Sequence, residues 1–179
     1  MKFGLVRHFK VDQTIEKSLL SPAEFNNVMN EYDSCPIIPN GLKLNSTDWD
    51  ICYCSTLPRA ITTAEMIYNK EIIKTDLIVE VPISPFTKMN IKLPTSLWHV
   101  GARIAWYKSH KSQMEDVHAT RQRIEEFYDL ITSTGHENIL IVSHGYFLHM
   151  FYEEMKKKGF KGEIEINIKN AKLYELINE

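Results

Sequence analysis

Two histidines in this sequence directly follow short apolar runs of the kind that form buried strands. His8 comes after Phe3-Gly4-Leu5-Val6 and Arg7, and His144 comes after Ile139-Leu140-Ile141-Val142-Ser143. Between them, a third such run leads into Pro58 and Arg59. In an open α/β sheet, strand ends and the starts of the following helices meet at one crevice. The spacing therefore predicts a cluster of two histidines and two arginines.

These residue types suit chemistry on a phosphoryl group. A neutral imidazole has a pKa close to working pH and can attack phosphorus to form a covalent phosphoramidate. The planar fork of an arginine donates two parallel hydrogen bonds to phosphoryl oxygens, which suits Arg7 and Arg59. The departing alkoxide also needs a proton, which a carboxylic acid at the rim of the site supplies. We therefore expect the cluster both to bind a phosphoryl group and to attack it.

Alternating strand and helix patterns position this cluster. Apolar runs predict the strands, while capping signals and helical periodicity predict the helices; Ser21 and Glu24 have the spacing of a capping box. The expected strands are Phe3–Val6, Asp50–Cys54, Leu77–Val81, Asn138–Val142, Glu163–Ile168 and Ala171–Ile177, and the expected helices are 22–33, 58–68, 97–107, 117–131 and 146–157. This order predicts a three-layer α/β sandwich, with a mostly parallel sheet, helices on both faces and an antiparallel hairpin at one edge. Residues 82–112 are expected to form a lid over the strand ends.

The composition limits the classes of function. The chain has 179 residues, of which 44% are hydrophobic, and a net charge of −2. This suits one globular domain and gives no indication of nucleic acid or an anionic membrane as a partner. No apolar stretch approaches the ~18 residues of a membrane span, and the N-terminus lacks a secretory apolar region. We expect a cytoplasmic protein, and the sequence leaves its oligomeric state open.

The chain has three cysteines, an odd number that suits a reducing compartment. Cys52 and Cys54 alternate along an expected strand and should point to the same face. No histidine or further cysteine pair is nearby, so they predict buried thiols rather than a metal site. We expect no metal and no other cofactor.

Three fragments of the sequence together resemble the histidine phosphatase superfamily, also called the phosphoglycerate mutase-like family. Leu5-Val6-Arg7-His8 looks like the N-terminal Arg-His motif of that family. Residues 55–65 resemble its Ser-x-x-x-Arg-Ala-x-x-Thr-Ala block, and Val142-Ser143-His144-Gly145 resembles its Ser-His-Gly motif. The fragments occur in the family's order, and the strands and helices that flank them span nearly the whole chain.

The resemblance implies a single histidine-phosphatase-like domain over residues 1–179, with the phosphoglycerate mutase-like fold. It implies a metal-independent phosphatase that hydrolyses a small phosphorylated metabolite. His8 would be the nucleophile that becomes phosphorylated, and Arg7, Arg59 and His144 would form the phosphate pocket. Glu80 would protonate the departing alcohol and then activate the water that hydrolyses the phosphohistidine.

The sequence departs from the family pattern at two places. Phe9 follows the nucleophilic histidine, where the family has glycine, and its side chain is expected to narrow the pocket or to stack on the substrate. Glu80 leads into Val81-Pro82-Ile83-Ser84-Pro85-Phe86, where many relatives have Gly-x-Trp-Glu-Gly. Another carboxylate, such as Asp12, is therefore an alternative proton donor.

Two other functions stay open beside the phosphatase. One is a phosphoglycerate-type mutase, although the extra substrate-binding segments of such mutases are not found in this sequence. The other is a regulatory module that binds phosphate and has lost turnover, for which Phe9 and the segment after Glu80 are the support.

Overall fold

The computed structural model describes residues 1–13 and 19–178 and is organised around a five-stranded sheet. The strand order is β6-β5-β8-β1-β9. The strands are β1 (Lys2–Arg7), β5 (Ile51–Ser55), β6 (Ile72–Thr75), β8 (Asn138–Ser143) and β9 (Leu173–Ile177). The pairings β6–β5, β5–β8 and β8–β1 are parallel, and only β9 runs antiparallel to its neighbour β1. This confirms the predicted mixed, mostly parallel sheet.

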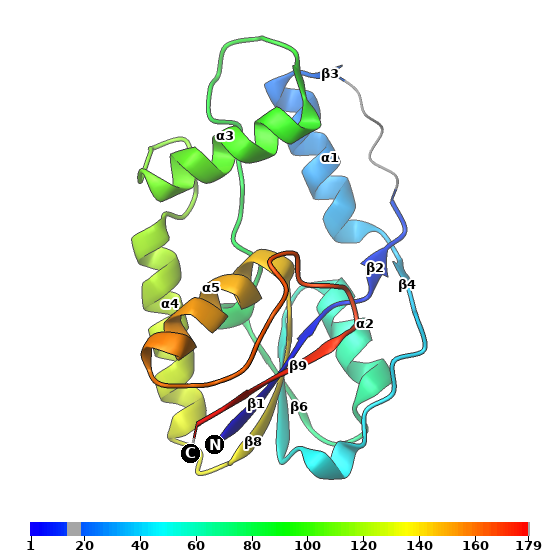
Figure 1. Cartoon of the computed structure of the whole chain (residues 1–179). Helices are drawn as coiled ribbons and strands as arrows, with labels where there is room; N and C mark the ends of the chain where they lie inside the picture. The colour runs from blue at the N-terminus through cyan, green and yellow to red at the C-terminus, as the bar shows by residue number, and fades with distance from the viewer. Residues whose placement is uncertain (14–18, 179) are drawn as a thin grey trace.

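Helices cover both faces of the sheet, because the strands are apolar on both sides (Figure 1). Helix α2 (Pro58–Ile67) packs on one face, in a core that includes Leu140 and Val142 of β8. Helices α4 (Val117–Thr132) and α5 (Gly145–Lys157) pack on the other, in a core that includes the alternate residues Ile139 and Ile141. The chain therefore has the predicted three-layer α/β architecture.

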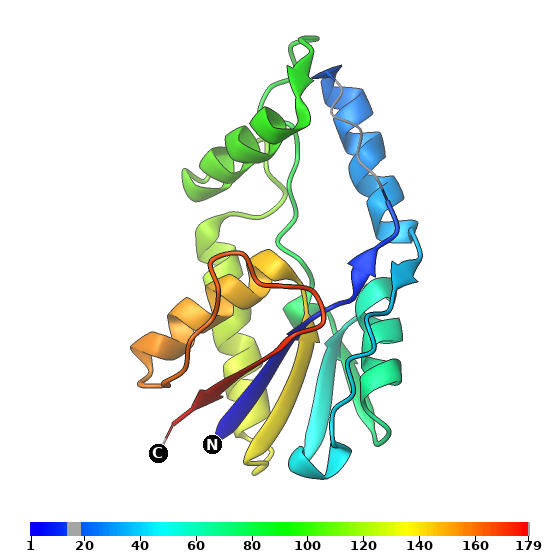
Figure 2. The same ribbon diagram turned by 45° about the vertical axis from the view of Figure 1, so that its right-hand side comes forward.

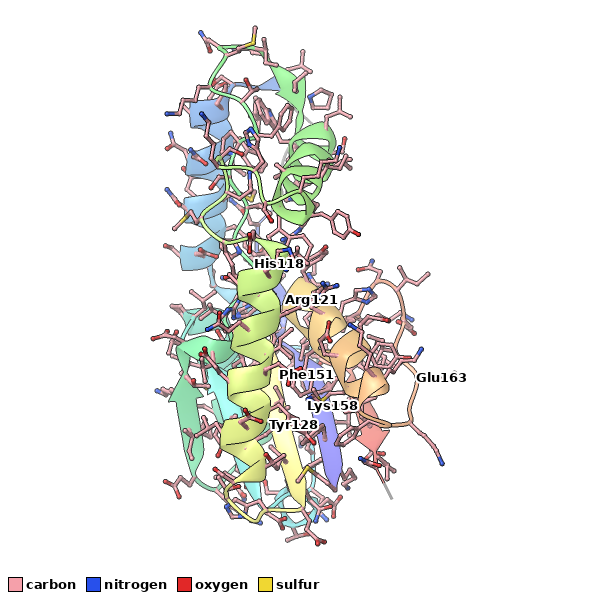
Figure 3. All side chains as sticks on the ribbon, turned by 90° about the vertical axis from the view of Figure 1, so that its left-hand side faces the viewer. His118, Arg121, Tyr128, Phe151, Lys158 and Glu163 are labelled. Carbon is pink, nitrogen blue, oxygen red and sulfur yellow. The ribbon has the colours of Figure 1, made fainter. Side chains whose placement is uncertain are left out.

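Figure 3 shows the face that carries α4 and α5. Phe151 of α5 lies between the two helices and is fully buried in the core against Phe127. At the edge of this pair, the Lys158 ammonium lies 4.4 Å from the Tyr128 ring centroid and 2.6 Å from the Glu125 carboxylate, both on α4. Apolar packing and a cation–π contact thus fix the helix whose first turn follows His144.

A smaller unit stands above the strand ends (Figure 2). It contains α1 (Pro22–Ser34), α3 (Thr95–Tyr107) and the short strand pair of β3 (Leu19–Leu20) with β7 (Leu93–Pro94). Leu20, Phe25 and Trp98 form its buried core. The capping box of α1 is confirmed, because the Glu24 N–H donates to Ser21 Oγ and the Ser21 N–H donates to Glu24 Oε2. Residues 82–112, the expected lid, supply β7 and α3 to this unit.

The remaining elements are short connections. Strands β2 (Lys10–Val11) and β4 (Ile37–Ile38) form a second antiparallel pair, which joins the chain after β1 to the chain after α1. Two 3₁₀ turns, Ser46–Asp48 and Asp76–Ile78, precede β5 and follow β6. No helix in residues 1–13 or 19–178 is both long enough and apolar enough to span a bilayer.

Two strand predictions are wrong. The third strand is Ile72–Thr75, and the chain then turns, because the Thr75 hydroxyl accepts the Leu77 N–H and starts a 3₁₀ turn. The edge hairpin is a single strand, β9, which pairs with β1. Glu163–Ile168 forms no named strand, because Ile166 points into solvent with 95% exposed and the Ile168 carbonyl accepts a hydrogen bond from Arg7 Nη1.

Candidate active site

His8 stands at the end of β1 with both ring nitrogens in contact with defined partners. Its Nδ1 lies 2.6 Å from the Phe9 carbonyl oxygen, which can only accept, so Nδ1 carries the proton. Its Nε2 lies 3.2 Å from Arg59 Nε, which can only donate, so Nε2 is unprotonated. The two contacts select one tautomer and leave a lone pair on Nε2.

Arg59 lies in the first turn of α2, which Pro58 begins. Its side chain is buried, with 3% exposed, and its Nε faces His8. The Thr63 hydroxyl, one turn later, donates to the Arg59 carbonyl and accepts the Phe9 N–H at 2.9 Å. This hydroxyl ties the backbone that follows His8 to the helix that carries Arg59.

His144 is the N-cap residue of α5, and its ring centroid lies 5.1 Å from that of His8. The two residues are neighbours because β1 and β8 pair in parallel up to Arg7 and Ser143, and the His8 N–H donates to the Ser143 carbonyl. His144 Nε2 lies 2.7 Å from Ser55 Oγ at the end of β5. Three parallel strands therefore end at one group of side chains.

Both histidines are held in the neutral form. Burial and the nearby Arg59 guanidinium lower the pKa of His8 from 6.5 to about 3. Burial also lowers the pKa of His144 well below its usual value, and the charge of Arg59 adds to this. A neutral imidazole keeps the lone pair that a nucleophile needs.

Arg7 lies beside the N-terminus of α5 and is fixed from the C-terminal segment. Its Nη1 donates to the Ile168 carbonyl at 2.8 Å, and its buried Nε has no hydrogen-bond partner. A Cβ at Gly145 would approach Arg7 Cζ to 3.2 Å, so the glycine gives the guanidinium room against the helix. The Asn170 side chain donates to the His8 carbonyl at 2.7 Å. An anion at this place would meet two guanidinium groups and a helix N-terminus.

Glu80 lies at the same helix N-terminus. Its carboxylate accepts the backbone N–H groups of Phe147 at 3.0 Å and Tyr146 at 3.3 Å, in the first turn after His144. Within residues 1–13 and 19–178, no hydrogen bond joins Glu80 to His8 or His144. Arg103 of α3 donates to the Val81 carbonyl and stacks on the Tyr146 ring, 3.7 Å from its centroid. The carboxylate is therefore anchored one helical turn from His144.

The structure gives clear positions for Phe9 and for Asp12, the alternative proton donor. The Phe9 side chain is 1% exposed and lies in the core on the α2 face with Val6, Trp49 and Cys54. The expectation that it lines the pocket is wrong, because the side chain points into the core. Asp12 is exposed beyond β2, where its N–H donates to the Pro36 carbonyl.

Sequence reasoning missed one charged neighbour of the cluster. Asp33, in the last turn of α1, accepts a hydrogen bond from Arg59 Nη1 at 2.6 Å. A carboxylate is unfavourable at the negative, C-terminal end of a helix. An aspartate just before the helix-breaking Cys35-Pro36 is therefore the sequence signal that could have pointed to a charged partner for Asp33.

Cys52 and Cys54 point to the same face, as predicted, and both are buried in the core beside α2. Burial raises the pKa of Cys54 to about 11 and raises that of Cys52 further. In the part of the chain that the structure describes, no three His, Cys, Asp or Glu side chains come together as a metal-binding group.

The fold and the strand-end cluster define an α/β protein of the phosphoglycerate mutase-like class. A family model described as "Histidine phosphatase superfamily (branch 1)" matches residues 41–178, and the chain therefore belongs to that superfamily. The matched range contains Arg59, Glu80 and His144, while Arg7 and His8 precede it. No protein with a curated functional description matches the sequence.

Solved structures share the fold at low sequence identity. An α-ribazole phosphatase from Shigella flexneri is 18% identical, with a TM-score of 0.60 over 98% of this chain and 89% of its own. A mutant phosphoserine phosphatase from Entamoeba histolytica, solved with phosphoserine, is 16% identical, with a TM-score of 0.61 over 98% of this chain and 90% of its own. At this identity the likeness establishes the fold.

Proposed function

We propose that this protein is a phosphomonoester phosphatase that acts through a phosphohistidine on His8. The observation that carries the proposal is the tautomer of His8, whose Nδ1 faces a carbonyl while its Nε2 lone pair faces Arg59. Membership of the superfamily supports a phosphatase-type or mutase-type reaction. A buried neutral histidine beside two arginines is suited to attack on a bound phosphoryl dianion.

In the first step, His8 Nε2 attacks phosphorus, and the bond between phosphorus and the ester oxygen breaks. Arg7, Arg59 and His144 stabilise the charge on the phosphoryl oxygens, and Glu80 gives its proton to the departing alcohol. In the second step, water attacks the phosphohistidine and gives a proton to the Glu80 carboxylate. Free phosphate leaves, and His8 returns to its neutral form.

Glu80 is the preferred proton donor over Asp12. Its carboxylate is anchored at the start of α5, the helix that His144 caps, whereas Asp12 is exposed beyond β2. Arg103, which lies next to Glu80, also borders a shallow groove of about 660 Å³ lined by Val100, Ile104, Trp106, Tyr107 and Tyr146. We propose that residues 82–112 act as a lid whose groove receives the leaving group of a small phosphorylated metabolite.

The test is hydrolysis of an aryl phosphate in the presence of a chelator, because the mechanism uses no metal. Wild-type protein should release phosphate, and His8→Ala should lose at least about 10³-fold in kcat. Phosphohistidine is hydrolysed in acid, so the reaction should be quenched rapidly in base. Intact mass measurement should then detect one added phosphoryl group in wild type and none in His8→Ala. His118→Ala is the matched control, because His118 is an exposed histidine in the first turn of α4 (Figure 3). Wild-type protein without turnover or phosphoryl transfer would overturn the proposal.

The substrate panel follows from the structural neighbours. α-Ribazole 5′-phosphate and phosphoserine are the first compounds to test, because proteins of the same fold are named for activity on them. A mutase would instead interconvert phosphoglycerate isomers, which NMR of a 3-phosphoglycerate incubation distinguishes from phosphate release. The alternative of an inactive phosphate-binding module loses one of its two supports, because Phe9 lies in the core. We further propose a cytoplasmic location, which suits the three free cysteines.

A further inference from the structure

The guanidinium of Arg59 is held at two separate edges. Its Nε donates to His8 Nε2 at 3.2 Å, while its Nη1 donates to the Asp33 carboxylate at 2.6 Å. In a guanidinium group, Nε–H and one N–H of Nη2 point the same way and form the side edge, whereas Nη1 lies on the other side of Nε. Asp33 therefore engages the far nitrogen and leaves the Nε/Nη2 edge directed at His8.

We propose that Asp33 is a positioning residue that fixes the Nε/Nη2 edge of Arg59 toward the phosphoryl group during transfer. This inference rests on the proposed phosphohistidine chemistry. A phosphoryl group on its way to His8 Nε2 lies beside that edge and can accept two parallel hydrogen bonds from it. Because preorganised donors stabilise developing charge without moving, an arginine clamped at its far side is more effective than a free one.

The last turn of α1 closes the solvent side of Arg59. The Arg59 side chain is 3% exposed, while that of Asp33 is 49% exposed, so the aspartate reaches a buried cation from the solvent side. Tyr32, the preceding residue, places its ring 5.2 Å from Arg59 Cζ. Figure 2 shows the lower end of α1 next to α2, and the last turn of α1 thus covers the guanidinium.

Asp33 stands where the helix itself disfavours a carboxylate. It lies in the last turn of α1, which carries no basic residue, and the partial negative charge of the helix end repels it. A half-exposed ion pair contributes little to stability. Stability therefore does not explain a carboxylate at this position, whereas its contact with the arginine that faces the nucleophile does.

A positioning role and a competing role make opposite predictions for Asp33→Asn. If Asp33 orients Arg59, removal of its charge leaves ground-state phosphate binding intact, since it deletes a negative charge near the anion, but lowers the rate of transfer. If Asp33 competes with substrate for Arg59, the same change raises kcat/KM. The two cases are therefore separated by the sign of the effect.

The experiment measures kcat and KM on an aryl phosphate, and the inhibition constants of phosphate and of vanadate, for wild type, Asp33→Asn, Asp33→Glu and Glu31→Gln. Vanadate adopts the five-coordinate geometry of phosphoryl transfer, while phosphate reports the ground state. We expect Asp33→Asn to lower kcat about 10- to 100-fold and to weaken vanadate by a similar factor, with phosphate bound no more weakly than in wild type. Asp33→Glu, which keeps the charge, should recover much of kcat, and the exposed Glu31→Gln on the same helix should match wild type.

Thermal unfolding of each variant separates this effect from loss of fold, and Asp33→Glu serves as the comparison if Asp33→Asn does not fold. Wild-type kcat in Asp33→Asn, or an increase in its kcat/KM, would overturn the positioning role while leaving the proposed phosphatase intact. An equal loss of phosphate and vanadate binding would also overturn it. Wild-type protein that neither turns over nor binds vanadate would overturn both the phosphatase and this inference.

Discussion

Acidification should destabilise this fold because His8 is buried in its neutral form. The pKa of His8 falls from 6.5 to about 3 in the folded protein, chiefly through burial and then through the charge of Arg59. The folded state therefore binds fewer protons than the unfolded state between these two values. The stability that neutral His8 confers is complete above pH 6.5 and is lost progressively as the pH falls toward 3.

The size of the loss follows from this difference. At about pH 5, an unfolded histidine is almost fully protonated, whereas His8 in the folded state is not, and the linkage relation gives a loss of about 2 kcal/mol compared with neutral pH. The pKa of His144 is lowered for the same reason, so His144 contributes in the same direction. A loss of this size is a large part of the stability of a typical domain.

Urea unfolding at about pH 7.5 and about pH 5 measures the effect when wild type is compared with His8→Gln and His118→Gln. Glutamine does not titrate, so the free energy of unfolding of His8→Gln should fall by about 2 kcal/mol less than that of wild type. The exposed His118 should make no such difference. Equal losses in wild type and His8→Gln would refute the reasoning, because they would mean that His8 titrates normally in the folded protein.

Three further changes test other parts of the structure. Phe9→Ala should lower the free energy of unfolding by about 3–5 kcal/mol, because the side chain is 1% exposed in the core; a loss close to zero in urea unfolding would contradict its burial. Gly4→Ala would bring a Cβ within 2.3 Å of the Trp49 ring and should cost about 1–3 kcal/mol in the same assay, whereas an unchanged midpoint would show that the ring moves freely. Glu80→Gln should lower kcat about 10²- to 10⁴-fold on an alkyl phosphate and less on an aryl phosphate, whose leaving group needs less protonation; equal losses on both substrates would argue against proton donation by Glu80.

Much of the arrangement around the cluster could be predicted from the sequence because it depends on local signals. Apolar runs mark the parallel strands that end at Arg7, Ser55 and Ser143, and parallel strands bring their carboxyl ends to one edge. The start of α1 is equally local, since Ser21 and Glu24 satisfy each other's backbone groups. These features need no information from distant parts of the chain.

The two incorrect strands depend on distant residues. The segment Leu77–Val81 has a strand-like composition, yet Arg123 of α4 donates to the Leu77 and Val79 carbonyls, which takes up acceptors that a strand would use. Glu163–Ile168 alternates well, yet Arg7 of β1 donates to the Ile168 carbonyl, which takes up an acceptor that a strand would use. The salt bridge of Asp33 to Arg59 joins two helices in the same way, and no pattern in either helix alone specifies it.

The contacts of Ile168 and Asn170 with the Arg7–His8 pair also set the order in which the site is assembled during synthesis. The groups that hold Arg7 and His8 lie 161 and 162 residues further along the chain. A ribosome-bound chain that has not yet released this segment already has His8, the proposed nucleophile, but lacks the acceptor for Arg7 and the donor for the His8 carbonyl. Translation therefore delivers Arg7 and His8 well before the groups that fix them, so a chain that has not been synthesised as far as Asn170 cannot yet hold the pair in place.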